Sequence, residues 1–497
     1  MSGRVVGYQF LMDTLGLGVL HLPRHAHVAP VSRVQDAADA ILIPQHVAPA
    51  SDHLVEHVLF ALKHEGTQLD VLAAAFRKMP PDALLGALRA TPTGGYIRKA
   101  CYLFEKLTGK NLEGFGGQGV PVPLFDPARY VVSESPVRDL KWRVDFNGLG
   151  DWNMCPMIRR TTRMDACLES DVLARAKSLF DHVAPEMVDR ALAWAYLNET
   201  KGSFAIEREN PPAGKAEAFA HLLRQAWEDR PMDETRLAQL QSVTMANPLL
   251  RAVEYRSEQN HLQAGTPGAA GVRYVPPAPG EVPSLMDGVL SIANGKNAMH
   301  PLVRASLASF GFVYVHPFMD GNGRLSRFLL HYVLAQARAL PDKGVLPISV
   351  AMKRNEMQYL SALESFSRPA RELWNVLWID GARFELDFRG DEAIYRYWDA
   401  TAQTEFLFEM AEQSLQHDLV AEVDFLQKFD TVYRRLDQEL DLQGRDLAAL
   451  IRACHQKGGV LSKNRRKQYA LTVPEDAFEA IEAKVKAAFF DPPVAEA

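Results

Sequence analysis

Two segments rich in glycine and proline interrupt a chain whose apolar residues otherwise recur at helical spacing. They read GFGGQGVPVPLFDPARY at 114–130 and AGTPGAAGVRYVPPAPGEVP at 264–283. Proline lacks a backbone N–H and glycine loses much conformational freedom on ordering, so neither segment can continue a helix. The sequence therefore predicts a protein of several helical units separated by these two breaks.

The breaks and the chain length of 497 residues predict roughly three domains of about 150 residues each. Apolar residues three and four apart predict short helices within 52–107. A helical N-terminal module is expected over 1–125 and a linker over 126–169. A central unit is expected over 170–380, and a C-terminal unit over 390–497.

Composition limits the classes of partner and the compartment. The net charge is −6, so there is no chain-wide electrostatic reason to bind nucleic acid or anionic lipid, and any basic surface must be local. No run of 18 apolar residues appears, so no membrane association is expected. The cysteines lack metal-ligand spacing and predict free thiols in a reducing cytoplasm: Cys101, Cys155, Cys167 and Cys454.

The residues that carry chemistry lie in LVRASLASFGFVYVHPFMDGNGRLSR, at 302–327. Gly321 and Gly323 allow positive φ and let backbone N–H groups converge beside the start of the next helix, which makes a cradle for phosphates. Asp320 supplies a hard oxygen of the kind that Mg²⁺ prefers. The segment therefore predicts an anion site with one carboxylate for a metal.

Two arginines and a histidine extend this site. Arg324 and Arg327 are three residues apart, so they share a helix face where two guanidinium groups could hold neighbouring phosphates. His316 titrates near neutral pH and could take a proton from an incoming hydroxyl. Together these groups indicate a nucleoside triphosphate site, whereas a buried helix-loop-helix corner would explain only one or two of them.

The segment HPFMDGNGRLSR resembles the Fic family motif HPFxDGNGRxxR at every specified position. The similarity extends over roughly residues 170–375, including GVRYVPPAPGEVPSLM and LPISVAMKRNEMQYLSAL. The resemblance implies a mainly α fold, with a helical Fic core and a short β-hairpin flap. An N-terminal helical module and a C-terminal winged-helix-like module are expected to flank that core.

The resemblance also implies transfer of AMP from ATP to a Ser, Thr or Tyr hydroxyl of a target protein, with release of pyrophosphate. By this analogy His316 is the base that deprotonates the target, and Asp320 would hold Mg²⁺, with Mn²⁺ as an alternative. The nucleotide phosphates would be held by Gly321, Asn322, Gly323, Arg324 and Arg327.

Two further pairs of residues are expected near the substrates. The flap around Arg273 and Tyr274 would align a target segment by strand addition, since backbone hydrogen bonds tolerate varied target sequences. Asn355 and Tyr359 are expected to border the base or the ribose of the nucleotide.

The segment GSFAIEREN at 202–210 resembles the inhibitory motif of the family, [S/T]xxxE[G/N]. Ser203 and Glu207 are four residues apart and share one face of a helix expected near 196–209. The resemblance implies that Glu207 pairs with Arg327 in place of the γ-phosphate and so prevents a productive ATP pose. Arg208 stands where Gly or Asn is expected, which leaves the tightness of this brake open. An ordinary surface glutamate is the alternative.

In the C-terminal unit, Gly458 and Gly459 are expected to form the turn before a basic hairpin, in the manner of a winged helix. The hairpin would carry Lys463, Arg465, Arg466 and Lys467. Such a wing could contact nucleic-acid phosphates, or could instead serve protein contacts or dimer packing.

The sequence thus predicts a cytoplasmic protein adenylyltransferase that depends on ATP and Mg²⁺ and is autoinhibited by Glu207. Its partners are a target protein of unknown identity or the chain itself, and a homodimer stays open. Alternatives within the family are removal of AMP and transfer from another nucleotide. An alternative of another class is a nucleotide-sensing regulator that binds DNA.

Overall fold

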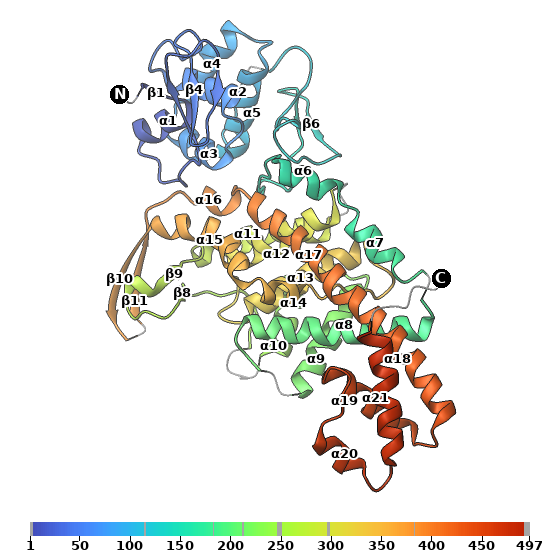
Figure 1. Cartoon of the computed structure of the whole chain (residues 1–497). Helices are drawn as coiled ribbons and strands as arrows, with labels where there is room; N and C mark the ends of the chain where they lie inside the picture. The colour runs from blue at the N-terminus through green and yellow to red at the C-terminus, as the bar shows by residue number, and fades with distance from the viewer. Residues whose placement is uncertain are drawn as a thin grey trace.

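The computed structural model of the chain is mainly α-helical, with short strands at its periphery (Figure 1). It describes residues 3–113, 116–181, 183–210, 213–245, 251–295, 299–381 and 383–491. The expectation of a mainly α fold is confirmed.

The N-terminal module adds a small sheet to the expected helices. Its elements are β1 (Val5–Val6), α1 (Gly7–Leu15), β2 (His25–Val28), β3 (Gln35–Asp36), β4 (Ala40–Ile43), α2 (Leu54–His64), α3 (Leu69–Lys78), α4 (Pro81–Ala90) and α5 (Gly95–Thr108). The strand order is β1-β2-β4-β3, with β2 and β4 parallel and the outer pairs antiparallel. The strands have two to four residues, too short for a clear alternation of apolar and polar side chains.

The segment expected to be a linker carries structure of its own. Strands β5 (Val122–Pro123), β6 (Val137–Asp139) and β7 (Val144–Phe146) form a sheet in the order β5-β7-β6, and α6 (Thr162–Glu169) and α7 (Val172–Ser178) follow. Trp142 and Val144 are fully buried, so this segment packs against the helical units that it connects.

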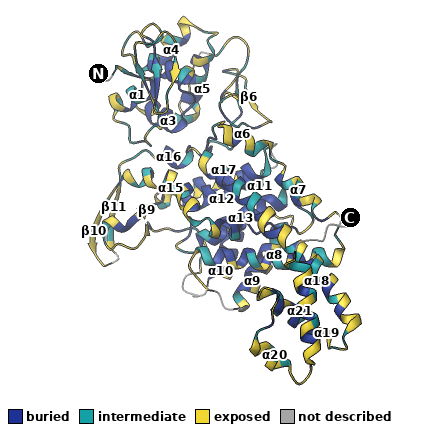
Figure 2. Cartoon of the chain, in the orientation of Figure 1, coloured by how far each residue is buried: buried dark blue, intermediate teal, exposed yellow. Residues whose placement is uncertain are grey.

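The central unit is built around α12 (Pro301–Val315), most of whose residues are buried. Its elements are α8 (Pro185–Ile206), α9 (Ala213–Arg224), α10 (Glu234–Thr244), β8 (Leu262–Gln263), β9 (Val272–Tyr274), α11 (Val282–Asn294), α12 (Pro301–Val315), α13 (Asn322–Gln336), α14 (Ile348–Arg354) and α15 (Glu356–Glu372). Helix α12 is apolar on nearly all sides, which suits a position inside the protein, and it packs against α11 and α13 (Figure 2). Strands β8 and β9 pair as the expected hairpin.

The chain continues through a second hairpin, which the sequence analysis did not identify, into the C-terminal helices. These elements are β10 (Trp374–Asp380), β11 (Arg383–Phe388), α16 (Ala393–Arg396), α17 (Thr401–Gln413), a π-helical segment (Ser414–Leu419), α18 (Val420–Glu439), α19 (Gly444–Gln456), α20 (Lys463–Tyr469) and α21 (Glu475–Phe489). Hairpin β10–β11 lies beside β9, with Trp374 against Val272 and Val275.

The expected basic hairpin of a winged helix is wrong, because its residues form helix α20. Ser462 caps this helix by accepting a hydrogen bond from the backbone N–H of Arg465 at 3.3 Å, and Lys, Arg and Gln favour a helix once it has begun. Arg466 is paired with Glu475 and Glu482, which reduces the positive charge that this face presents. DNA binding through the C-terminal unit stays a prediction.

Most of the buried apolar side chains form one large cluster and a separate C-terminal one, and two small clusters lie at the N-terminal sheet and at the flap. The large cluster runs from Tyr8 to Leu426, and the C-terminal cluster from Phe429 to Val485. The C-terminal helices dock on the central unit through α18, which packs against α8, and Arg190 pairs with Asp430 at 2.7 Å. Within the described residues, no helix has the length and apolar character needed to cross a membrane.

Candidate active site

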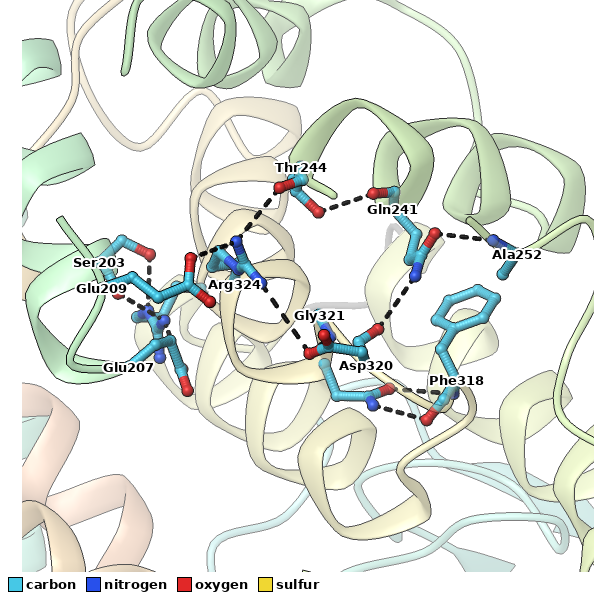
Figure 3. Close-up of polar contacts among 12 residues, drawn as sticks. Ser203, Glu207, Glu209, Gln241, Thr244, Ala252, Phe318, Asp320, Gly321 and Arg324 are labelled. Carbon is cyan, nitrogen blue, oxygen red and sulfur yellow. Dashed lines mark hydrogen bonds and ion pairs between the residues drawn. The ribbon is translucent and has the colours of Figure 1, made fainter. Parts of the chain in front are cut away.

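The loop between α12 and α13 is held by its own backbone and by one asparagine. The side-chain Oδ1 of Asn322 accepts the N–H of Phe318 at 3.0 Å, and its Nδ2 donates to the carbonyl of Phe318 at 2.7 Å (Figure 3). The ring of Phe318 is buried, which fixes the loop to the core. The side chain of Asn322 thus acts on the loop itself, and its expected contact with the α-phosphate stays a prediction.

His316 is a neutral base at the start of this loop. Its Nδ1 donates to the carbonyl of Val313 at 3.3 Å, which leaves Nε2 with the free lone pair. Burial, as the main cause, lowers the pKa of His316 to about 4, although the charges of Glu207 and Asp320 raise it. The imidazole can therefore accept a proton at neutral pH.

The two arginines of the motif are buried on one side of α13, and neither makes all the hydrogen bonds that its guanidinium group can donate. Arg324 and Arg327 are 3% and 2% exposed. The Nε of Arg324 and the Nη1 of Arg327 are buried and find no hydrogen-bond partner in the described part of the chain. Buried donors without partners are costly, and an anion with several oxygens would satisfy them. The arrangement fits a site for phosphate groups.

Glu207 lies in this site and pairs with Arg327, as the resemblance implied. Its Oε1 accepts a hydrogen bond from Nη2 of Arg327 at 2.7 Å, and Nε of the same guanidinium donates to the Ser203 hydroxyl at 2.8 Å. The carboxylate also lies against the backbone of Gly323, where a Cβ atom would come within 2.0 Å of Oε1. Glu207 therefore lies at the start of α13, where the helix favours negative charge.

A second carboxylate of the same segment pairs with the other arginine, which the sequence analysis missed. Oε2 of Glu209 lies 3.0 Å from Nη1 of Arg324, which also donates to the carbonyl of Thr244 at 3.2 Å (Figure 3). Both cations of the motif are thus neutralised by residues just beyond α8. The spacing of the carboxylates, two residues apart, matches neither helical nor metal-ligand periodicity, so it gave no signal.

The backbone conformation of Arg208, between the two glutamates, explains why the motif favours glycine or asparagine at this position. Its φ is +59°, in the left-handed region that these two residues adopt most easily. The chain turns at this residue, and Glu207 and Glu209 then reach two different arginines.

Asp320 fits the role of a metal ligand only in part. Its Oδ1 accepts the N–H of Gly321 at 2.6 Å, and the side chain is 46% exposed. The described residues contain no group of three or more His, Cys, Asp or Glu side chains that could hold a metal ion. A divalent cation here would depend on oxygens of a bound nucleotide as well as on Asp320.

The other expected site residues are spread over different surroundings. Tyr359 lies beside Arg327 and Glu207; burial is the main cause that raises its pKa, and the Arg327 charge opposes this. Asn355 instead donates to Gln413 of α17 at 2.7 Å and to the carbonyl of Ala351. Their roles at the base or ribose stay predictions.

In the flap, the side chain of Arg273 is exposed and that of Tyr274 is buried, and their expected role in aligning a target segment by strand addition stays a prediction. Tyr274 is 3% exposed, and its hydroxyl donates to the carbonyl of Tyr314 at 2.6 Å. The β-strand alternation puts consecutive side chains on opposite faces, so only one of the pair can point outward.

Other parts of the chain also hold the motif loop, and no local sequence signal marks them. Gln241 of α10 donates to the carbonyl of Asp320 at 3.2 Å and accepts the N–H of Ala252 at 2.9 Å (Figure 3). Arg256 donates to the carbonyl of His316 at 2.9 Å. The two contacts with the loop join residues 60 or more positions apart, which local spacing does not predict.

Comparison with known proteins agrees with this geometry. Residues 231–334 match the model of the Fic/DOC family. The protein adenylyltransferase Fic of Aedes aegypti is 37% identical over 93 residues, which are 18% of this chain and 17% of that protein. Its counterpart in Drosophila grimshawi is 35% identical over 88 residues, 17% of each chain. This chain thus covers only a small part of the curated relatives that it matches.

Among solved structures, a Fic family protein from Desulfovibrio desulfuricans G20 is similar at 20% sequence identity and a TM-score of 0.38. The match covers 64% of this chain and 87% of that one.

Proposed function

From the premise that residues 231–334 form a Fic/DOC-family domain, we propose that this protein is an adenylyltransferase that modifies protein hydroxyl groups with AMP. The observation that carries the proposal is a neutral His316 at the head of a loop that leads to two buried arginines with unpaired N–H groups. The adenylyltransferase name of the matched relatives supports the same reaction.

In the proposed reaction, the target hydroxyl oxygen forms a bond to the α-phosphorus of ATP while the bond to the bridging oxygen of pyrophosphate breaks. His316 Nε2 accepts the hydroxyl proton, and pyrophosphate leaves with the bonding electron pair. Arg324 and Arg327 bind the phosphates and stabilise their charge. Asp320 would hold Mg²⁺, which neutralises phosphate charge when bound.

The contacts of Glu207 and Glu209 support an autoinhibited resting state. Each carboxylate holds one of the arginines that the phosphates need. ATP could bind productively only after these carboxylates move away. In the proposed function, the segment just after α8 is therefore a brake made of two ion pairs.

Intact mass after incubation with ATP and Mg²⁺ tests the proposal. We expect Glu207→Gly to gain the mass of one or more AMP groups, wild type to gain little, and Glu207→Gly/His316→Ala to gain none. A matched control is Glu217→Gly, which removes an exposed glutamate of α9 and should behave as wild type.

If Glu207→Gly gains no mass, the proposal fails for ATP and self-modification. The same samples are then incubated with CTP, GTP and UTP, and with an AMP-modified protein. These arms distinguish transfer from another nucleotide and removal of AMP.

A further inference from the structure

Three successive carbonyl oxygens at the end of α12 are bound by side chains from outside the helix. The hydroxyl of Tyr274 donates to Tyr314 O at 2.6 Å, and the guanidinium of Arg256 donates to Val315 O at 3.4 Å and to His316 O at 2.9 Å. The last carbonyls of a helix have no partner within it, and a left-handed glycine usually closes such an end. Here the left-handed residue is His316, with φ +52°.

A histidine in this conformation has a cost that glycine avoids, about 1 kcal/mol or more. His316 stays there because its surroundings fix the backbone. Its N–H bonds to Phe312 O at 2.9 Å, and its carbonyl is held by Arg256. The side chain of the base is thus aimed by contacts on its backbone.

Arg256 is a buried cation whose partners are backbone oxygens. It is 6% exposed, and besides the end of α12 it donates to the carbonyls of Glu258 and Pro277. In the described part of the chain no carboxylate forms an ion pair with it. Burial lowers the pKa of Arg256 to about 10, so it remains charged at neutral pH. A buried guanidinium is costly unless its hydrogen bonds are made, and its position at a helix C-terminus helps to offset that cost.

The same guanidinium connects the motif loop to the flap. Pro277 lies three residues after the end of β9, and the backbone N–H of Arg256 donates to Pro317 O at 2.8 Å. Gln259 reinforces the link by donating to Pro276 O at 2.9 Å. Arg256 therefore holds the base and the foot of the flap in one fixed relation.

We propose that Arg256 is a positioning residue that sets His316 relative to the flap along which a target segment would lie. The inference rests on the proposed function, in which His316 takes the target proton. A general base must come within about 2.6–3.2 Å of that proton's oxygen, and a displacement of about 1 Å can cost about 100-fold in rate. Neither the family comparison nor the motif assigns this residue a role.

The test compares Arg256→Met with Arg304→Met, both in the Glu207→Gly parent. Arg304 is a matched control because it is also 6% exposed and also binds backbone carbonyls, those of Gly295 and Val333. We expect Arg256→Met to lower kcat of self-labelling by about 10-fold or more and to leave KM for ATP within about twofold. Arg304→Met should lower Tm but not kcat.

Arg256→Lys separates geometry from charge. Lysine keeps the positive charge but has no planar fork, so it should recover little of the lost kcat. Equal losses of kcat in the Arg256 and Arg304 variants, or an unchanged kcat in Arg256→Met, would overturn the inference.

Amide hydrogen exchange gives a readout that does not depend on labelling. Arg256→Met should increase exchange in peptides that cover 313–323, and Arg304→Met should not. If the Glu207→Gly parent shows no self-labelling, the proposed function fails, but hydrogen exchange still tests the positioning role. Unchanged exchange over 313–323 in Arg256→Met would then overturn it.

Discussion

Two glutamates, Glu199 near the C-terminal end of α8 and Glu207 just after its last residue, face the same helix, α13, in very different surroundings. Glu199 is 1% exposed; it pairs with His331 at 2.8 Å and accepts the N–H of Ser349 at 2.7 Å. Glu207, two turns later, is 35% exposed and pairs with Arg327. The carboxylate of Glu199 is enclosed by the fold. In the proposed function, that of Glu207 would be replaced by the phosphates of a nucleotide, so that one helix would position both a permanent anchor and a removable inhibitor.

The largest effect on stability is expected at Glu199. Glu199→Ala leaves His331 and the N–H of Ser349 without their buried partner, so the free energy of unfolding should fall by about 3–5 kcal/mol. Urea unfolding followed by circular dichroism measures this. Glu199→Gln keeps the shape and most hydrogen bonds and should lose clearly less. A loss below about 1 kcal/mol for Glu199→Ala would show that Glu199 and Glu207 do not differ in their contribution to the fold.

Glu207→Gly should raise activity and should cost less stability than Glu199→Ala, because the Glu207 side chain is partly exposed. Hydrogen bonds to charged groups contribute about 1.5–3 kcal/mol, so removal of this competitor should speed self-labelling by about 10- to 100-fold. Initial rates of AMP incorporation measure this, beside the Glu217→Gly control. A large loss of Tm with no gain in rate would place Glu207 with Glu199 as a structural group.

Glu209→Gln should give a smaller gain. Its side chain is 47% exposed, and such pairs contribute about 1 kcal/mol or less, so labelling should rise by about two- to fivefold. A double variant with Glu207→Gly tests whether the two ion pairs act together, since coupled residues deviate from additivity. An unchanged labelling rate in both backgrounds would show that the Glu209–Arg324 ion pair does not contribute to inhibition.

Arg208→Gly should tighten the brake, because it removes the strain of a left-handed arginine. The gain is about 0.5–1 kcal/mol after the greater freedom of glycine in the unfolded chain is subtracted, so wild-type labelling should fall by about two- to fivefold. In the Glu207→Gly background the same change should have no effect on the rate. An equal effect in both backgrounds would mean that Arg208 acts elsewhere.

Local spacing was enough to predict the candidate site residues that lie within a single segment of the chain. His316, Arg324 and Arg327 lie within twelve positions of one another, and Ser203 and Glu207 share one helix face. The pairing of Glu207 with Arg327 follows from the resemblance and is found in the structure. The contact of Glu209 was not predicted, because this residue lies beyond the end of α8, where the 3.6-residue helical period no longer applies.

Contacts between distant segments could not be predicted in this way. Arg256 has no local sequence signal, and its proposed positioning role depends on four carbonyls brought together by the fold. Hairpin β10–β11 did have a sequence signal, since residues that favour strands, such as Val376 and Trp378, come before a turn at Gly381. The double glycine before α20 suggested a hairpin turn, but the capping serine at 462 decided the outcome.

The close contact between α8 and α14 has a consequence for how the brake responds to nucleotide. At Gly202 a Cβ atom would come within 2.8 Å of the backbone of Ser349, so the helix cannot slide to a new register, which would bring a larger side chain to that point. In the proposed function, Glu207 would therefore be a tethered competitor of the nucleotide phosphates: its local concentration at Arg327 is set by the fold and does not fall when the protein is diluted. The degree of inhibition should depend on nucleotide concentration alone and stay constant across protein concentrations.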